Sequence, residues 1–490
     1  MMRRGHLRPG PIFQVLLLVL IVFAFSRISH SGEEAIGSTR IKPLARTWKV
    51  EADTSIAYPY SDIGGEIRLR FVDFGSAIGL GSETDPDRRF FRIRGRLWYE
   101  HRFNPATRVV AGLANESFSF LECESCDSEF GEIIFESLYL EWIRQAGQPV
   151  GLRIGRQDLF YADGLLVCDG GPLDGSRTIY VNGAALTSSI PLWSFDIFTA
   201  YNPKTDEYLP RINSKYRKLI EHYEFLAGIM ARRTAPDGGK TSYAIEPYYI
   251  YKREMDDPRN ASIHTVGIRL GFPIWQTRFA TELAYQAGKV PETEISEDSP
   301  VEIPDLYGPQ SISAYAATVK LGMDLGEPIS GNITLGYIHL QGDERTTRNK
   351  YEGWNPVLGR WPIWSELYIY TLLMERDAHP MKQGVAFWQN LKAPYLDLRI
   401  GPHRHLKFLG RYMRLGADES IFSDPQNEGP LDRGNLLVFR LSYNPLPDWS
   451  VHLHFEAFRP GGFYDPYFES IEAEGPEDAT FFRIEVKKVF

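Results

Sequence analysis

The chain has 490 residues and a formal charge of −9 at pH 7, and aromatic residues make up 13% of it, including 26 Tyr and 10 Trp. The acidic excess argues against a general nucleic-acid-binding protein, which would present a basic surface. Beyond the N-terminus no segment approaches the roughly 20 consecutive apolar residues of a membrane-spanning helix, which excludes a helical membrane bundle. The many aromatic residues suit the interfacial rings of a membrane barrel, although a secreted lectin shares that richness.

The first residues have the order of a secretory signal peptide. A basic start with three arginines precedes an apolar run over residues 12–25, and small residues flank a cleavage site after Ser31. The segment 1–31 holds four arginines and no acid, so its removal leaves about −13 rather than −9. We therefore predict a signal peptide at 1–31, an N-terminal periplasmic segment at 32–63 and a barrel at 64–490. An uncleaved signal anchor is the alternative.

From about residue 64 the sequence divides into eighteen strand-like segments of roughly 8–15 residues, whose connections alternate between short and long. The tight turns follow even-numbered segments and lie at Asn104–Ala106, Gly147–Pro149, Pro273–Ile274, Gly326–Pro328, Gly401–His403 and Asn444–Pro447. The long polar connections follow odd-numbered segments and include residues 75–88, 202–221, 289–310 and 342–384. Short periplasmic turns and long outer loops are typical of an even-stranded outer-membrane barrel.

Alternation within the segments indicates which strand face meets lipid. In residues 89–102 the even positions are mostly charged and the odd positions mostly apolar. Side chains two residues apart share one face of a strand, so Arg92, Arg94 and Arg96 lie on one basic face. In a soluble sandwich the apolar face would meet a second sheet. In a membrane barrel it meets lipid, and closure pairs every strand edge. We predict an all-β transmembrane antiparallel barrel of about 18 strands.

Two segments fit the alternation less well. Residues 243–252 carry Tyr on both faces, and residues 384–401 contain Pro394, which is compatible with a bend or bulge. Counts of 16 or 20 strands are therefore alternatives. The final strand-like segment ends on Phe490, which has the form of the C-terminal signal that the barrel assembly machinery reads.

Two of the three cysteines, Cys123 and Cys126, form a Cys-x-x-Cys within an acidic loop. In an oxidising compartment this spacing favours a local disulfide. A metal site would need two further ligands, and none is close in the sequence. A thioredoxin-like motif would need a βαβ unit, which the surrounding sequence does not predict. Cys168 has no predicted role.

Three short motifs resemble the alginate export family of outer-membrane barrels. Residues 458–464, Phe-Arg-Pro-Gly-Gly-Phe-Tyr, resemble the segment before that family's last strand. Residues 152–157, Leu-Arg-Ile-Gly-Arg-Gln, are similar to its Leu-Arg-x-Gly-Arg-Gln strand, and residues 174–177, Asp-Gly-Ser-Arg, to its Asp-Gly-x-Arg pattern. The resemblance covers roughly 64–490. It implies a monomeric barrel of eighteen strands with a narrow electropositive pore that guides an anionic uronate polysaccharide outward.

The resemblance also implies pore residues. Arg96 falls on a pore arginine of the second strand, Arg360 loosely on another, and Glu485 on an acidic residue of the last strand, while Arg68 is the candidate for the first strand. The charged strand faces add Arg92, Arg94, Arg153, Arg440, His452 and Arg483. Guanidinium groups attract carboxylates because they are permanently charged and offer forked donors. The alternative is that these arginines pair with acids as part of the wall.

Three positions depart from the family's pattern. His452 stands where the exporter has an arginine on the penultimate strand, Asp158 follows the Gly-Arg-Gln motif in place of an arginine, and Glu136 replaces a fourth-strand arginine. The set of pore arginines that selects anions in the family is therefore only partly present here. The sequence does not decide whether alginate itself is the cargo.

Two further groups have both a structural and a functional interpretation. Arg153 and Arg156 are expected to tie the lumen wall to acids in loops. The expected acids are Asp158, Asp163 and Asp174. The loop at 342–384 contains three Trp and at least three Arg. It either folds into the pore as a gate, with rings that stack on sugars, or packs its aromatic rings on the rim.

Motifs of enzymes are missing from the sequence, which has no Gly-x-Ser-x-Gly elbow, no His-Glu-x-x-His and no phosphate loop. A metal-binding lumen cluster of His403, His405, His452 and His454 is one interpretation, and solvated or charge-paired histidines are the simpler one. We expect no enzyme activity, no metal and no cofactor.

The sequence thus predicts a passive channel in the bacterial outer membrane for anionic solutes, with export of an acidic polysaccharide such as alginate as the favoured function. A general porin, or one for uptake of sugars or anions, is the alternative in transport. A barrel adhesin or hydrolase acting through its loops is the alternative from another class. Expected partners are outer-membrane lipid and lipopolysaccharide, the barrel assembly machinery, the polysaccharide or a small anion, and a periplasmic export partner, with no nucleic acid.

Overall fold

The computed structural model describes residues 57–82, 87–122, 133–145, 150–169, 180–209, 212, 223–234, 244–255, 260–291, 309–326, 330–344, 346–347, 349–359, 363–371, 388–423 and 429–490. These residues all belong to one compact unit, Leu44–Phe490. The predicted signal peptide, Cys123, Cys126, Arg360 and Asp174 lie outside the described residues, so the corresponding predictions stay predictions.

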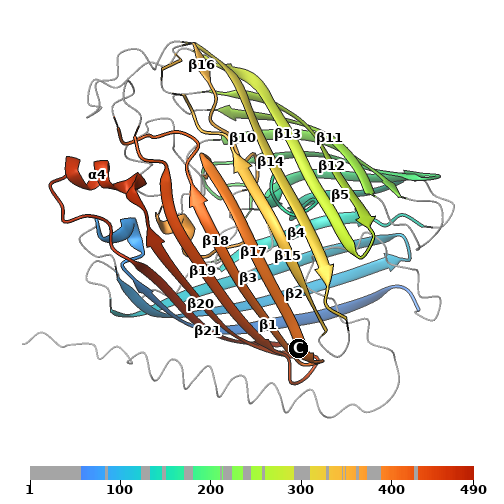
Figure 1. The fold of residues 1–490 in the computed structure, drawn as a ribbon. Helices are drawn as coiled ribbons and strands as arrows, with labels where there is room; N and C mark the ends of the chain where they lie inside the picture. The colour runs from blue at the N-terminus through green and yellow to red at the C-terminus, as the bar shows by residue number, and fades with distance from the viewer. Residues whose placement is uncertain are drawn as a thin grey trace, which may run out of the picture. The chain divides into compact units, whose positions relative to one another are not determined.

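Long strands make a closed antiparallel barrel (Figure 1). They are β1 (Tyr60–Gly75), β2 (Arg88–Asn104), β3 (Thr107–Glu122), β4 (Ile133–Trp142), β5 (Val150–Gln157), β8 (Val181–Ile190), β9 (Trp193–Asn202), β10 (Tyr223–Thr234), β11 (Ala244–Met255), β12 (Ser262–Ile274), β13 (Thr277–Val290), β14 (Gln310–Asp324), β15 (Gly331–Leu340), β17 (Leu391–His403), β18 (Leu406–Gly416), β19 (Asp432–Tyr443), β20 (Trp449–Pro460) and β21 (Ala479–Val489). β1 pairs with both β2 and β21, which closes the barrel. The prediction of eighteen strands is confirmed.

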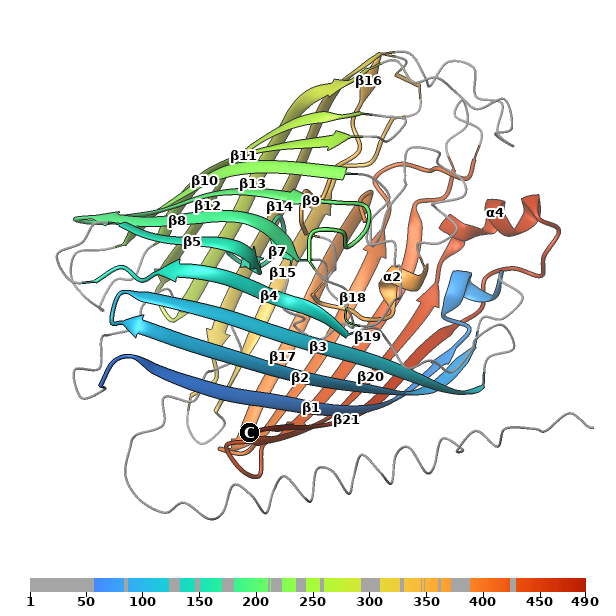
Figure 2. The same cartoon turned by 180° about the vertical axis from the view of Figure 1, so that it is seen from behind.

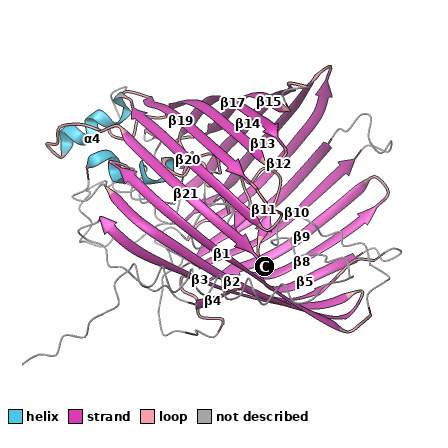
Figure 3. Ribbon diagram, turned by 90° about the horizontal axis from the view of Figure 1, so that it is seen from below, coloured by secondary structure: helices cyan, strands magenta, loops and turns pink. Residues whose placement is uncertain are grey.

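Smaller elements lie between the long strands. The short strands are β6 (Leu159–Phe160), β7 (Cys168–Asp169) and β16 (Lys350–Tyr351). The short helices are η1 (Ile78–Gly81), α2 (Tyr368–Thr371), η2 (Gly462–Tyr464) and α4 (Asp465–Ser470). Figure 3 shows α4 at the end of the barrel that lies away from the C-terminus. Within the described ranges, no helix is long and apolar enough to cross a bilayer.

Short turns and long loops alternate along the chain as predicted. Two turns lie later than expected. β12 continues through Pro273 and turns at Trp275, which has a positive φ of 54°. β17 continues through Gly401 and turns after His403, with a register shift between Ile400 and His403. Pro273 therefore lies in a regular ladder just before the turn, whereas Gly401 lies in an irregular one.

The strand faces follow the predicted alternation. On β2, Arg92 and Arg94 are buried inside, whereas Leu97 is 48% exposed on the outer face. β11 also obeys the rule, although its sequence was ambiguous. Tyr248 is buried inside and donates its hydroxyl to Glu282 at 3.1 Å, whereas Tyr249 lies outside. Because the long strands place polar side chains inward, the lumen is lined with charge.

Loops fill the lumen toward the end where the long connections lie. Figure 2 shows α2 and β7 enclosed by the strands of the barrel. The largest buried hydrophobic cluster joins inward wall residues, such as Ala393 and Leu415, to loop residues such as Leu165 and Trp354. Apolar burial inside the barrel holds these loops in place, since it removes their side chains from water.

Candidate pore

The long loop between β15 and β17 folds into the lumen, and we call its described residues 353–359 and 363–371 the strap. Asn355 anchors the strap to one side of the barrel. Its backbone N–H donates to Oε1 of Gln286 at 2.9 Å, and Nε2 of Gln286 donates to its carbonyl oxygen at 2.7 Å. Its Nδ2 donates to Glu254 at 3.0 Å. These bonds satisfy buried backbone groups that would otherwise be costly to desolvate.

Glu456 on β20 anchors the strap to another part of the wall. Its buried carboxylate accepts hydrogen bonds from Oγ of Ser365 at 2.5 Å and from the backbone N–H of Glu366 at 2.7 Å. Nε2 of His454 lies 2.7 Å from the same carboxylate. Because Nδ1 of His454 accepts from Nε of Arg440 at 3.0 Å, the ring proton lies on Nε2 and donates to Glu456. Hydrogen bonds to a charged acceptor are strong, so this end is firmly held.

A second loop, at residues 158–169, crosses the lumen and pairs with the strap. The backbone N–H of Leu358 donates to the carbonyl oxygen of Leu166 at 2.9 Å, and the N–H of Cys168 donates to that of Leu358 at 3.1 Å. Val167 and Leu358 form a parallel bridge. The two loops thus support each other as a small sheet inside the barrel.

Asp163 fixes the tip of the second loop to the wall. Its carboxylate accepts hydrogen bonds from Nζ of Lys320 on β14 at 2.7 Å and from Nη2 of Arg269 on β12 at 3.1 Å. Burial alone would raise the pKa of Asp163, but Lys320 and Arg269 outweigh it and hold the pKa below its usual range. The carboxylate is therefore charged at neutral pH and neutralises part of the positive lumen.

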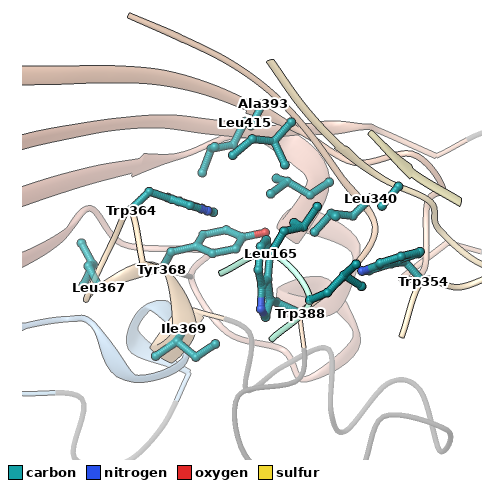
Figure 4. Packing of buried hydrophobic residues seen from close by; sticks show 14 of the residues in the cluster. Leu165, Leu340, Trp354, Trp364, Leu367, Tyr368, Ile369, Trp388, Ala393 and Leu415 are labelled. Atoms are coloured by element: carbon teal, nitrogen blue, oxygen red, sulfur yellow. The ribbon is translucent and has the colours of Figure 1, made fainter. Parts of the chain in front are cut away.

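Aromatic side chains of the strap pack among themselves. The ring of Trp364 lies 5.0 Å from Tyr368 and 6.1 Å from Trp388. Trp388 donates its indole N–H to the strap carbonyl of Gly359 at 2.7 Å. Figure 4 shows these rings beside Leu165 of the second loop. Of the two interpretations of this loop, the described residues follow the one in which it folds into the lumen.

The predicted basic face of β1 and β2 points inward, and its arginines are paired with acids. The salt bridges are Arg68 with Glu116 (3.0 Å) and Glu485 (3.7 Å), Arg92 with Glu116 (2.9 Å), Arg94 with Glu66 (2.6 Å) and Arg96 with Glu136 (2.7 Å). Glu485 also bonds Arg70. Glu136, which replaces a family arginine, is thus the partner of Arg96. The side chains of this array are buried, and its five arginines share four glutamates.

Three more predicted residues lie beside this wall. Nε of Arg483 donates to Nε2 of His452 at 3.1 Å, and Nδ1 of His452 lies 3.5 Å from Glu485. Nη1 of Arg483 forms a salt bridge with Glu366 of the strap at 3.3 Å. The structure therefore brings Arg483, His452 and Glu485 together with Arg68, and connects them to the strap.

The motif arginines of β5 have partners other than those expected. Arg153 donates to Glu141 on the neighbouring strand at 2.7 Å, and its guanidinium lies 4.5 Å from the ring centre of Tyr139. Arg156 makes a bidentate pair with Asp206 at 2.9 and 2.6 Å. Arg156 therefore ties the wall to an acid in a loop, as expected. The acid is Asp206, in the loop after β9, and not one of the three acids that the sequence suggested. Arg153 bonds Glu141 within the wall, and its expected pairing with a loop acid stays a prediction.

The four histidines do not form one cluster. His405 lies at the β17–β18 turn, where its Nδ1 is 2.7 Å from the carbonyl oxygen of Asn444. His452 and His454 lie further along the lumen in the networks already described. Among the residues that the structure describes, no group of three or more His, Cys, Asp or Glu is placed to hold a metal ion.

A cavity of about 590 Å³ lies below the strap, along the inward faces of β14 to β19. Its basic lining residues are Lys320, Arg399, Lys407, Arg411 and Arg440, and its acidic ones are Asp163 and Glu282. Asp397 bonds Arg411 at 2.5 Å and also lies 3.5 Å from Arg399, whose side chain is 57% exposed. Within the described part of the chain, no acidic side chain pairs with Lys407. The rings of Trp364, Trp388 and Tyr395 close the inner end.

Of these cavity residues, the sequence predictions named only Arg440 as a pore residue. The alternation that identified Arg92 and Arg94 on β2 also runs through β18, where Lys407 and Arg411 share the inward face with Met413. Applying the same rule to β17 would have added Arg399. The strand pairing also creates a row of alternating charge that crosses four strands, in the order Arg232, Glu246, Arg269 and Glu282.

The family model described as alginate export matches residues 59–466. The chain belongs to the alginate export family. A search of curated proteins finds no match. Among solved structures, OccAB4 of Acinetobacter baumannii has a TM-score of 0.52 at 9% identity, covering 88% of this chain and 98% of that one. OccK5 (OpdH) and OpdQ of Pseudomonas aeruginosa each have a TM-score of 0.51, at 15% and 13% identity, with the same coverages.

These solved structures share the fold of the alginate export family member described here. The protein is therefore a β-barrel of the bacterial outer membrane and a passive channel, as the sequence predicted. The end with short turns faces the periplasm and the end with long loops faces outward.

Proposed function

We propose that this alginate export family channel carries anionic saccharides along the basic wall of the cavity, on β14 to β19. The observation that supports the proposal is the contrast between the two sides of the lumen. Arg96 and its neighbours on β1 and β2 are buried against glutamates. Lys407, in contrast, has no acidic partner among the described residues, and Arg399 stays 57% exposed although it lies 3.5 Å from Asp397. A passing carboxylate needs a cation that water still reaches, since a paired one must first lose its partner.

The arrangement supports a path with weak successive contacts. A carboxylate that enters from the periplasmic turns meets Lys407 first, then Arg399 and Arg440, which strand pairing aligns with Leu409, and then Arg411. The rings of Tyr395, Trp364 and Trp388 then offer apolar surface to the faces of sugar residues. Conduction requires sites that attract the solute and still release it. Exposed cations meet that requirement because water screens them.

The strap supplies the narrow part of this path in the proposal. It lies above the cavity and is anchored at Gln286 and Glu456, on separate strands. A saccharide of more than a few residues passes only if the strap shifts. The proposed direction is outward, and the proposed cargo is an acidic polysaccharide with uronate residues, as in the alginate export family. The paired arginines on β1 and β2, together with Arg153, Arg440, His452, Arg483 and Glu485, set the field of the wall.

Planar bilayers test the proposal. We expect wild-type channels to prefer anions and to be blocked by uronate oligomers, but not by neutral oligomers of equal length. Arg399→Gln combined with Lys407→Gln removes two exposed charges. Each is worth about 1 kcal/mol to a nearby anion, or about fivefold in occupancy, so the reversal potential moves toward cation preference.

Arg414→Gln is the matched control, because Arg414 lies on the outer face and pairs with Asp432 at 2.6 Å. It should leave the reversal potential unchanged. An unaltered potential in the double variant would refute the path along this wall. Anion preference without block by uronates would instead assign the channel to small anions.

A further inference from the structure

The outer face of the barrel carries a basic row near its extracellular end. Strand pairing aligns Arg253 on β11 with Ser262 on β12, and Ser262 with Lys289 on β13. Lys289 is aligned with Ser311 on β14, and Ser311 with Lys350 on β16. The five positions thus form one line across neighbouring strands, with a cation at every second position. In Figure 1 these strands end beside the β16 label.

The side chains of this row point away from the lumen. The residues on either side of Arg253 are Lys252 and Glu254, and both are buried inside. Val290, next to Lys289, is also buried inside. Because side chains alternate along a strand, Arg253 and Lys289 face outward, and both are exposed.

The row lies just beyond a band of tyrosines on the same face. Tyr249 bonds His264 at 2.7 Å, and the ring of Tyr251 lies 5.0 Å from His264. Tyrosine rings with polar tips are typical of the boundary between acyl chains and headgroups. Arg253 is two residues beyond Tyr251, or about 7 Å along the strand, toward the extracellular end. The cations therefore lie at the level of lipid headgroups.

Two cations of the row, Arg253 and Lys289, differ from several other outward cations in their pairing. Lys392 pairs with Asp418 at 2.7 Å, and Arg414 pairs with Asp432. The third cation of the row, Lys350, also bonds an acid, Glu352. Across the described ranges, however, Arg253 and Lys289 have no acidic partner. Two outward cations at headgroup level thus have no counter-charge from the described protein.

The row is held rigid from behind. Ser311 donates its backbone N–H to the carbonyl oxygen of Asn349 at 2.9 Å, which fixes β16 alongside β14. Tyr351, next to Lys350, packs inside the barrel with Ile263 and Ile312 in a separate buried cluster. A preorganised row binds a ligand without the entropy cost of ordering it.

We propose that the row of Arg253, Lys289 and Lys350 binds the phosphate groups of lipopolysaccharide in the outer leaflet. Successive cations are two strands apart, or about 10 Å, so a headgroup with more than one phosphate spans neighbouring cations. Ser262 places a hydroxyl donor between the first two. Arginine and lysine are the side chains that recognise phosphate best. The site requires the outer-membrane location and is independent of the cargo.

Titration of the full barrel in detergent with fluorescent lipopolysaccharide tests the site. The variant combines Arg253→Gln with Lys289→Gln, and we expect its affinity to fall at least about tenfold. Enzymatically dephosphorylated lipopolysaccharide should bind the wild type as weakly as the intact lipid binds the variant. Arg414→Gln is the control and should retain wild-type affinity, and the shift in gel mobility on heating verifies that each barrel is folded.

Two results would overturn the proposal. One is equal affinity of the double variant and the wild type for intact lipopolysaccharide. The other is a competition result. Inorganic phosphate, or vesicles of a simple anionic phospholipid, would displace labelled lipopolysaccharide from the wild type at the same phosphate concentration as unlabelled lipopolysaccharide does. The first outcome would remove the residues from the site, and the second would leave only general attraction of anions.

Discussion

At the scale of single residues, the ability of each charged side chain in the lumen to interact with a solute depends on whether a neighbouring opposite charge already pairs with it. Glu485 is shared by Arg68 and Arg70, and Glu66 pairs with Arg94. Removal of one partner from such a buried pair leaves an uncompensated charge, which costs about 3–5 kcal/mol. Exposed cations such as Lys407 carry no such penalty. The cations that can act on a solute are therefore those of the cavity wall, whose side chains are less buried than the arginines of β1 and β2.

Asp163 offers a direct test of charge compensation, because it neutralises Lys320 and Arg269 at the edge of the cavity. Asp163→Asn at neutral pH leaves Lys320 without its carboxylate partner, while Arg269 keeps its salt bridge to Glu246 at 2.9 Å, so the preference for anions should rise about fivefold for one added charge. The depressed pKa of Asp163 means that the wild type keeps its carboxylate charged in mild acid and loses it only below the ordinary value of 3.8. The difference in reversal potential between variant and wild type should persist from pH 7 to about 4 and close below it.

Asp418→Asn is the matched control for this experiment. Asp418 is held by Lys392 and His339 on the outer face, and although burial opposes it, these partners and the N–H of Gly342 keep its pKa well below the usual range. The carboxylate lies away from the lumen, so its removal should not change selectivity. Equal potentials for Asp163→Asn and the wild type would show that Asp163 does not influence permeating ions.

At the scale of elements, the strands could be predicted and the loops could not. Alternation on β2 placed Arg92 and Arg94 inward because lipid on one side and water on the other impose a period of two. The strap follows no such rule. Its bonds from Asn355 to Gln286, and from Ser365 to Glu456, join positions that are far apart in sequence. Likewise nothing near Arg156 indicates that Asp206 is its partner.

Release of the strap should widen the channel. Glu456→Gln replaces one acceptor oxygen by a donor, so the strap loses part of its anchoring by Ser365 and Glu366. Hydrogen bonds to charged groups contribute about 1.5–3 kcal/mol each. We expect larger and noisier single-channel conductance, and a further increase when Gln286→Ala removes the other anchor.

Ser442→Ala is the control for the strap, because Ser442 lines the same cavity and the described structure shows no bond between it and the strap. Its conductance should equal that of the wild type. If Glu456→Gln and the double variant both conduct as the wild type does, the strap is not the constriction, and the lumen must be narrowest elsewhere.

At the scale of the whole molecule, the barrel depends on the seam between its first and last strands. At the periplasmic end of the seam, Gly65 donates its N–H to the carbonyl oxygen of Phe490 at 2.9 Å, and Phe490 donates to Gly65 at 2.9 Å. The ring of Phe490 covers the position that a side chain at residue 65 would occupy. An aromatic ring thus covers an unprotected glycine backbone, and this protects the last paired residues from slipping.

This packing predicts that Gly65 tolerates no large side chain. Gly65→Leu must displace the ring of Phe490, and overpacking of this kind costs about 1–3 kcal/mol. Gly95→Leu is the matched control, because a side chain at Gly95, on the neighbouring strand and the same outer face, meets open space. In gels run without heating, Gly65→Leu should show less of the compact folded band than Gly95→Leu at equal expression. Equal folded fractions would mean that the seam closes without the ring, and that the register of β1 against β21 is set by their remaining pairs alone.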